Sequence, residues 1–366
     1  TCALPICSYP PEFYSWIEKP AVRSLFERIA IETEEDYQNI IRKLESFGVE
    51  VLRPDLPNNT FVDGKYVPAP MTPRDYTLMI GNTYFDSNTK SIVINYNKIK
   101  DPSWPNIANR EEFNALPDSI RTECEEVHGI HLYSYKCFEK INQHIIQQGN
   151  SIIYEPSESL VNGAMVSRIG KDLYFSTEYY TQDQIKYKEY INSKFTNTRN
   201  YIVNTGGHGD GTYCPVCPGL IISLKDVPTY ADTFPDWEVV YLPNQSWSMV
   251  NDFLYLKQKN GGKWWIPGFE YNQDVVDTVE QWLGHWTGYV EETVFDVNML
   301  IIDPKNVIVF NYNKKVFDAL SRYGIIPHIV PFRHRYFWDG GIHCVTSDLH
   351  REGTMKDYFP YREKNV

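Results

Sequence analysis

The string DGGIHCVTSDLHREG, residues 339–353, combines residue types that can perform covalent chemistry. Two glycines precede Cys344, and glycine permits tight backbone geometry and a close approach of ligand to backbone. A cysteine after such a turn can be exposed in a cleft, where its thiolate can attack an electrophilic carbon. If the segment is extended, His343 points away from Cys344 and need not be its base. A lone cysteine without such neighbours is more often a buried small hydrophobe.

A second string, NTGGHGDGTYCPVC, places His208 two residues before Asp210. In an extended segment these two side chains face the same side and can reach one ligand. An imidazole and a carboxylate on one face, flanked by glycines, favour a functional site over a structural histidine. Cys214 and Cys217 form CPVC, but a zinc site needs a second pair at similar spacing, which the sequence lacks. Metal and redox roles are therefore not favoured.

A third string, MTPRDYTLMIGN, places Arg74 and Asp75 ahead of an expected strand. Charges at a strand end usually mark a solvated edge, so this string alone indicates no site.

The composition excludes some classes of function. The 366 residues carry a formal net charge of -12, which disfavours binding driven by nucleic-acid phosphates. With 42% hydrophobic residues the chain can bury a large core, and no apolar run approaches the roughly 20 residues that span a bilayer. Seven scattered cysteines fit a reducing cytoplasm better than a disulfide scaffold.

A repeating unit positions these strings. Residues 299–333 predict strand, turn, strand, helix, glycine and strand, with Asn313 as the helix N-cap and Gly324 in the left-handed position after the helix. An earlier copy predicts a helix capped by Thr33 and ended by Gly48, followed by a strand at 49–55. That copy continues with TLMIGNTYFD and SIVINYNK as an expected strand pair. Further copies include the strands AMVSRIG, DLYFS, NYIVN, GLIISL and EVVYLP.

Four or five such units predict an α/β protein in which pseudo-symmetric modules form a ring around a ligand cleft. Two ordinary α/β domains are the alternative. Residues 246–289 interrupt the pattern and are rich in aromatic residues, which indicates an insertion that serves as a lid, an interface or a satellite core. Residues 1–20 are rich in proline and are expected to form a loop.

Taken together, the strings resemble the amidinotransferases of the pentein superfamily, especially the glycine amidinotransferase group. The resemblance rests on GVEVLRPD, MTPRD with LMIGN, GKDLYF, HGDGTY with PGLIIS, and GGIHCVTSDLHREGT, which occur in the family's order and cover most of the chain. It implies one domain over residues 1–366, a five-bladed α/β propeller of ββαβ modules around a central cleft.

The resemblance also implies a reaction. Cys344 would attack the guanidinium carbon of an arginine-like donor, and an acceptor amine would then take the amidino group from the cysteine. His208 would protonate the leaving amine and deprotonate the acceptor. Asp75 and Asp210 would hold the planar cation. The substrate would also be bordered by Arg74, Gly207 and His343. No cofactor or metal, nucleic acid or membrane is expected, and family habit suggests a homodimer.

Two positions depart from the family pattern. Asn162 stands where the family carries an acid, so a catalytic Asn162 would orient His208 or hydrogen-bond the guanidinium without supplying charge. Glu291 and Glu292 replace a pair of small hydroxyl residues. Two acids repel a carboxylate and attract an ammonium, which predicts an unusual donor or acceptor, unless both point to solvent.

Two rival functions remain open at this level. Related penteins hydrolyse guanidines with the same residue types, and water then replaces the acceptor amine. A non-catalytic protein that binds guanidines is the second rival, against which the joint presence of Cys344, His208, Asp75 and Asp210 weighs.

Overall fold

The computed structural model describes residues 15–54, 72–86, 139–154, 161–177, 182–224, 227, 230–242, 268–269, 271–282, 296–338, 340–353 and 355–362, together with four two-residue strands. These strands form two antiparallel pairs, β1 (Phe61–Val62) with β2 (Lys65–Tyr66) and β5 (Ser91–Ile92) with β6 (Leu132–Tyr133). The predicted strand SIVINYNK overlaps β5 and otherwise lies outside the described residues.

Four three-stranded sheets repeat one topology. In each sheet the second strand is central, antiparallel to the first and parallel to the third. A parallel pair requires a crossover, and a helix lies on each of the four crossovers. The first module comprises β3 (Thr77–Ile80), β4 (Thr83–Asp86), α6 (Glu139–Gln147) and β7 (Ser151–Tyr154), and the second comprises β8 (Val166–Ile169), β9 (Asp172–Thr177), α7 (Gln182–Lys194) and β10 (Arg199–Asn204). The third comprises β11 (Tyr213–Cys217), β12 (Leu220–Ser223), α8 (Tyr230–Thr233) and β13 (Glu238–Tyr241). The last comprises β14 (Leu300–Asp303), β15 (Asn306–Val309), α11 (Lys314–Arg322) and β16 (Ile326–Ile329).

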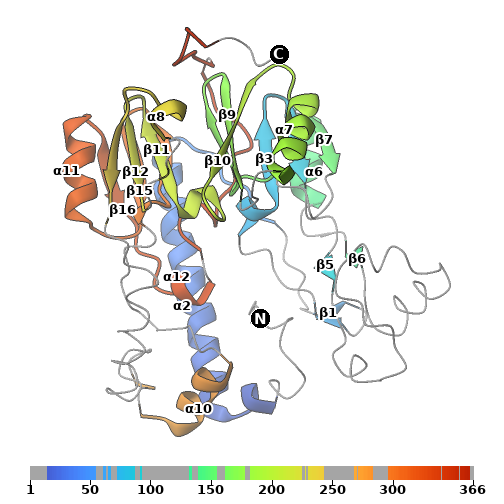
Figure 1. Ribbon diagram of the computed structural model, residues 1–366. Helices are drawn as coiled ribbons and strands as arrows, with labels where there is room; N and C mark the ends of the chain where they lie inside the picture. The colour runs from blue at the N-terminus through green and yellow to red at the C-terminus, as the bar shows by residue number, and fades with distance from the viewer. Residues whose placement is uncertain are drawn as a thin grey trace, which may run out of the picture.

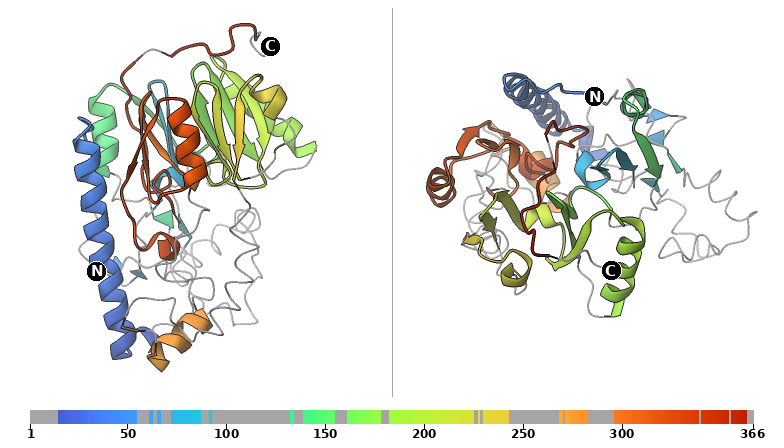
Figure 2. Two further views of the ribbon diagram at one scale, coloured as in Figure 1. Left: turned by 90° about the vertical axis from the view of Figure 1, so that its left-hand side faces the viewer. Right: turned by 90° about the horizontal axis from the view of Figure 1, so that it is seen from above.

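The modules follow one another around an axis in chain order, with the long helix α2 (Pro20–Glu45) on the remaining side (Figures 1 and 2). They are four separate sheets and not one closed sheet. The predicted ββαβ repeat is therefore found in four copies, and the described residues hold no fifth copy of it.

The chain after α2 joins the first module to the last. Val51 packs against the core that α2 shares with β14, β15 and the residues after β16. Leu52, the next residue, packs against Met79, Tyr84 and α6 of the first module. Consecutive residues thus contact both ends of the series of modules. The predicted strand at 49–55 is wrong for residues 49–54, which have no assigned strand.

The start of the first helix differs from the prediction. α2 begins at Pro20, 13 residues before the predicted cap Thr33, because proline suits the first helical position and apolar side chains already recur with helical spacing from Val22. Thr33 is buried in mid-helix and its Oγ1 accepts a hydrogen bond of 2.8 Å from Nε1 of Trp338. The helix ends as predicted, with Gly48 at φ 77°.

The last module agrees most closely with the sequence analysis. Asn313 caps α11, its side chain accepting from the backbone N–H groups of Lys315 and Val316. Gly324 follows the helix at φ 70°. The helix of this module could be predicted because its cap, its apolar face and the glycine that ends it all lie between Asn313 and Gly324.

Of the predicted insertion at 246–289, the structure describes only residues 268–269 and 271–282. Within it, α10 (Gln273–Trp282) packs on α2 through Val275 and Val279, both fully buried. This part joins the core that α2 shares with β14 and β15, and the lid, interface and satellite-core roles of the insertion stay predictions. No described helix combines the length and apolar character needed to cross a membrane.

Candidate active site

The turn that carries Cys344 brings two consecutive side chains to one carboxylate. Residues 342–345 form a turn in which the backbone N–H of Val345 donates to the carbonyl of Gly341 at 3.2 Å. The expectation that His343 points away from Cys344 assumed an extended segment and is wrong. Nδ1 of His343 lies 2.8 Å from Oδ2 of Asp210, and the thiol of Cys344 donates to the same oxygen at 3.4 Å.

Asp210 is placed by a short 3-10 helix, η4 (Gly209–Gly211), and not by the extended segment that the sequence predicted. The helix can approach β9 only because residue 209 is glycine, since a Cβ there would lie 2.2 Å from Oγ of Ser176. The N–H of Asp210 donates to the carbonyl of Ala164 at 3.2 Å. The Asp210 side chain is consequently buried beside the thiol.

Oδ1 of Asp210 is buried and has no hydrogen-bond partner among the residues that the structure describes. Buried carboxylate oxygens are rarely left without a donor, so this atom is suited to receive an N–H group from a ligand. Burial alone would raise the pKa of Asp210, but the hydrogen bond with His343 and the charges of His343, His208 and Arg74 hold it below its usual value. The carboxylate is therefore ionised at neutral pH.

His208 and Asp75 form the second half of the site. Nδ1 of His208 lies 3.7 Å from Oδ1 of Asp75, and the imidazole is 53% exposed. Asp75 ends a 3-10 helix, η2 (Pro73–Asp75), directly before β3. The negative charges of Asp210 and Asp75 both act on Cys344, and together with burial, the largest cause, they raise the thiol pKa well above its usual value. The four residues thus converge electrostatically on one site.

Arg74 packs against the turn at residues 342–345, which carries Cys344, and its side chain is not exposed to a substrate. It is 3% exposed, its Nε donates to the carbonyl of His343 at 3.1 Å, and its backbone N–H donates to the carbonyl of Cys344 at 3.3 Å. Its Nη1 pairs with Asp348 at 3.1 Å, and Asp348 also pairs with Arg168 and Arg351. This partly buried network ties η2, β8 and the residues after the turn together.

Asn162, the predicted catalytic amide, holds a backbone turn. Its Oδ1 accepts from the N–H groups of Ala164 and Met165 at 3.1 and 3.0 Å. Gly163, the residue after Asn162, packs on Arg74, where a Cβ would lie 2.4 Å from the arginine Cδ. No hydrogen bond joins Asn162 to His208 in the described part of the chain. The contacts of Asn162 are those of a residue that shapes the site.

A residue that the sequence did not single out lies at the centre of the site. Asn298 precedes β14, is 3% exposed, and its Nδ2 donates to Sγ of Cys344 at 3.0 Å. Its Oδ1 accepts from the N–H groups of His343 and Cys344. A polar residue directly before an apolar strand was the available signal, but that pattern is common and unspecific.

The remaining predicted residues have different positions. Gly207 lies in the turn before His208, and its carbonyl accepts from Oγ1 of Thr205 at 2.6 Å. Glu291 and Glu292 lie outside the described residues. Cys214 and Cys217 are free thiols on β11, and burial raises their pKa values to about 12 and about 11. The residues described gather no group of three or more side chains with metal-ligand character.

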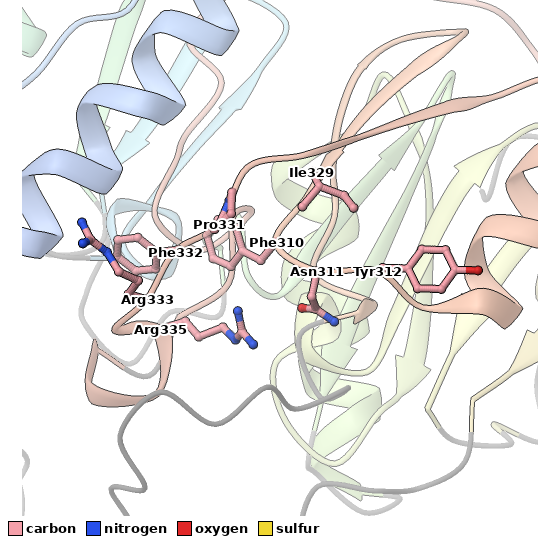
Figure 3. Close-up of a pocket in the computed structure, with 8 residues that line it drawn as sticks. All are labelled: Phe310, Asn311, Tyr312, Ile329, Pro331, Phe332, Arg333 and Arg335. Carbon is pink, nitrogen blue, oxygen red and sulfur yellow. The ribbon is translucent and has the colours of Figure 1, made fainter. Parts of the chain in front are cut away.

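A cavity of about 470 Å³ lies beside α12 (Arg335–Trp338) and is lined by none of the predicted site residues (Figure 3). Its walls are Phe310, Asn311, Tyr312, Ile329, Pro331, Phe332, Arg333 and Arg335. Asn311 in its wall donates to Asp296 at 2.5 Å, and Asp296 lies two residues before Asn298 in the sequence. It is separate from the thiol and its carboxylates.

Comparison with known proteins gives sequence relatives over part of the chain. No protein-family model matches the sequence. Mitochondrial glycine amidinotransferase of Xenopus tropicalis is 25% identical over 152 residues, 42% of this chain and 28% of that protein. L-arginine:L-lysine amidinotransferase of Pseudomonas savastanoi pv. phaseolicola is 23% identical over 152 residues, 41% of this chain and 32% of that protein. The match therefore spans about a third or less of each relative's length.

Solved structures match over nearly the whole chain. SxtG, an amidinotransferase of the saxitoxin pathway from Microseira wollei, has a TM-score of 0.57 at 17% identity, covering 96% of this chain and 88% of that one. Inosamine-phosphate amidinotransferase StrB1 of Streptomyces griseus has a TM-score of 0.56 at 16% identity, covering 91% and 84%. The resemblance predicted from the motifs is confirmed: this chain is similar to amidinotransferases in sequence over part of its length and in fold over most of it.

Proposed function

We propose that this protein is an amidinotransferase in which Cys344 carries the amidino group. The observation that supports this most strongly is the thiol of Cys344 at 3.4 Å from Asp210, whose other oxygen is buried without a donor. A guanidinium cation supplies planar N–H donors that match a carboxylate. Its carbon would then lie beside the sulfur, which is the geometry that nucleophilic attack needs.

Donor binding and thiol ionisation are linked in this proposal. The charges of Asp210 and Asp75 oppose a thiolate in the empty site. A cation bound between them offsets both charges, so Cys344 loses its proton more readily once the donor is present. The sulfur then forms a bond to the guanidinium carbon, and the C–N bond to the leaving amine breaks.

His208 performs the proton transfers. Its position beside Asp75 and its exposure allow it to reach the amine that leaves and the amine that enters. It gives a proton to the leaving amine, and later takes one from the acceptor as the acceptor nitrogen bonds to the amidino carbon. The C–S bond breaks in this second step and the thiolate returns.

The proposal for the acceptor rests on Glu291 and Glu292 as the sequence gives them. If these two acids border the entering amine, they favour an acceptor with a second cationic group over one with only a carboxylate. We therefore propose an acceptor of the lysine type, with arginine or a related guanidine as the donor.

We also propose that the fold is a five-bladed propeller in which α2 is the helix of the fifth blade. The protein would act as a homodimer in the cytoplasm.

Hydrolysis is the second candidate function. The N-terminal domain of ArgZ, solved covalently bound to a reaction intermediate, has a TM-score of 0.50 at 11% identity and covers 92% of this chain and 91% of that one. The fold is therefore shared with a protein that forms a covalent intermediate. Whether water or an amine resolves the intermediate distinguishes the two functions.

The test uses intact-protein mass spectrometry in two stages. Arginine alone should add one amidino group to wild-type protein and none to Cys344→Ser. Lysine, glycine and uncharged amines are then added singly, and the amidino group should move to lysine. Release of ammonia or urea without modified amine would establish hydrolysis instead. Absence of any adduct, with arginine in excess over a range of pH, would refute both reactions.

A further inference from the structure

Asn298 uses every polar atom of its side chain within the active site. Oδ1 accepts from the backbone N–H groups of His343 at 2.8 Å and Cys344 at 3.2 Å. Nδ2 donates to the carbonyl of Asp210 at 3.1 Å and to Sγ of Cys344 at 3.0 Å. One buried amide thereby connects the nucleophile, its backbone and the segment that carries the substrate carboxylate.

These contacts fix which way the amide points. Its oxygen faces two N–H donors, so the opposite orientation would place an NH₂ group against them and leave both without acceptors. The NH₂ group must therefore face the sulfur. Because the amide is nearly fully buried, it does not exchange this contact for one with water.

We propose that Asn298 is a catalytic residue of the reaction proposed above, and that its Nδ2 donor stabilises the thiolate of Cys344 in each state where the sulfur carries negative charge. The need for such a donor is evident from the surroundings. Two carboxylates and burial oppose ionisation of the thiol, while the donor from Asn298 and the backbone near Gly341 favour it. The donor also aims the sulfur at the ligand space beside Asp210.

The backbone opposite Asn298 leaves no room for a side chain. A Cβ on Gly341 would lie 2.3 Å from Oδ1 of Asn298 and 2.6 Å from its Cγ. Gly341 lies outside the left-handed region, so alanine is not excluded there by its backbone dihedral. Residue 341 is therefore glycine because the Asn298 amide leaves no room for a Cβ. The variant Gly341→Ala should displace that amide while leaving Asn298 itself unchanged.

The experiment measures the rate at which iodoacetamide alkylates Cys344 between pH 6 and pH 10.5, quantified on the peptide that contains Cys344. The midpoint is defined as the pH at which a variant reaches the rate that the wild type shows at pH 8. Asn298→Asp keeps an acceptor for the two backbone N–H groups but removes the donor to sulfur. We expect its midpoint to rise by about one to two pH units, with alkylation at pH 8 slowed about ten- to hundredfold. Gly341→Ala should shift the midpoint in the same direction.

Two control variants separate this effect from general destabilisation. Thr198→Val removes the hydroxyl, directly before β10, that contacts the carbonyl of Phe195 and Oδ1 of Asn200, which weakens the fold without contacting the site. Gly211→Ala adds a methyl group next to Asp210 where no atom lies within 4 Å. Both should retain the wild-type midpoint, and circular dichroism confirms that each variant is folded.

Unchanged midpoints in both Asn298→Asp and Gly341→Ala would overturn the proposal, as would an equal shift in the control variants. If Asn298→Asp fails to fold, Gly341→Ala alone decides the question. Alkylation requires no donor or acceptor, so the result can be read even if amidino transfer is not observed. A shifted midpoint without transfer would retain the role of Asn298 and reject the proposed reaction.

Discussion

Oδ2 of Asp210 lies 2.8 Å from Nδ1 of His343 and also accepts the thiol hydrogen bond of the next residue, Cys344, at 3.4 Å. The two oxygens of this carboxylate are thus used differently. Oδ2 contacts the turn that carries the nucleophile, while Oδ1 is buried and has no donor in the described part of the chain. The Asp210 carboxylate therefore holds the Cys344 thiol in place and also raises its pKa.

Replacing Asp210 should have opposite effects on thiol reactivity and on catalysis. In Asp210→Asn the amide oxygen can still accept from His343, but one negative charge near the sulfur is lost. The thiol pKa then falls, and alkylation of Cys344 at pH 7 should be about tenfold faster. Amidino transfer should fall at least about a hundredfold, because the guanidinium loses its charged partner.

The control for that variant is Asp318→Asn, on the exposed surface of α11. It removes the same charge far from the thiol and should alter neither rate. Slower alkylation in Asp210→Asn would contradict the electrostatic assignment.

Asp348 should make the stability of the protein sensitive to acid. Burial alone would raise its pKa, but the charges of Arg74 and two further arginines lower it well below its usual range. A carboxyl with a depressed folded pKa stabilises above its unfolded value of about 4, and the contribution disappears as pH falls toward the folded pKa.

Asp348→Asn should therefore lose about 3 kcal/mol of unfolding free energy at pH 7, and the difference from wild type should shrink below about pH 4. Urea unfolding at pH 7, 5, 4 and 3 measures this. A difference that stays constant from pH 7 to pH 3 would show that Asp348 is not ionised in the folded protein.

Asn162 should tolerate replacement by aspartate better than by alanine. Aspartate keeps an oxygen for the N–H groups of Ala164 and Met165, whereas alanine leaves two buried donors without a partner. Asn162→Ala should lose about 1–3 kcal/mol of stability and Asn162→Asp much less, as thermal unfolding can measure. If Asn162→Ala keeps both stability and the transfer rate, neither a structural nor a catalytic role remains.

Thr33 should contribute to stability through its contact with Trp338 and not as a helix cap. Thr33→Val leaves the buried indole N–H without an acceptor and should cost about 1–3 kcal/mol. Thr33→Ser retains the hydroxyl and should cost much less. A larger loss in Thr33→Ser than in Thr33→Val, measured by urea unfolding, would indicate that the methyl group and not the hydroxyl is the important part.

The sequence was sufficient where structure is decided locally. The strands of the last module, the cap at Asn313 and the glycine at Gly324 depend on residues within one or two turns, and they were predicted correctly. The start of α2 was missed because the pattern from Thr33 onward looked complete, although Pro20 and the apolar residues after it already begin the helix. The sequence predicted four or five repeats, and the described residues contain four of them.

By itself, the sequence determined which residue types could perform the chemistry: a cysteine after two glycines, an imidazole near a carboxylate, and a second carboxylate before a strand. Only the tertiary structure decided which atoms meet. Asn298 and Asp210 reach Cys344 across 46 and 134 residues of chain, and Arg74 reaches His343 across 269. Such contacts arise when separate modules pack around one axis, and no local periodicity encodes them.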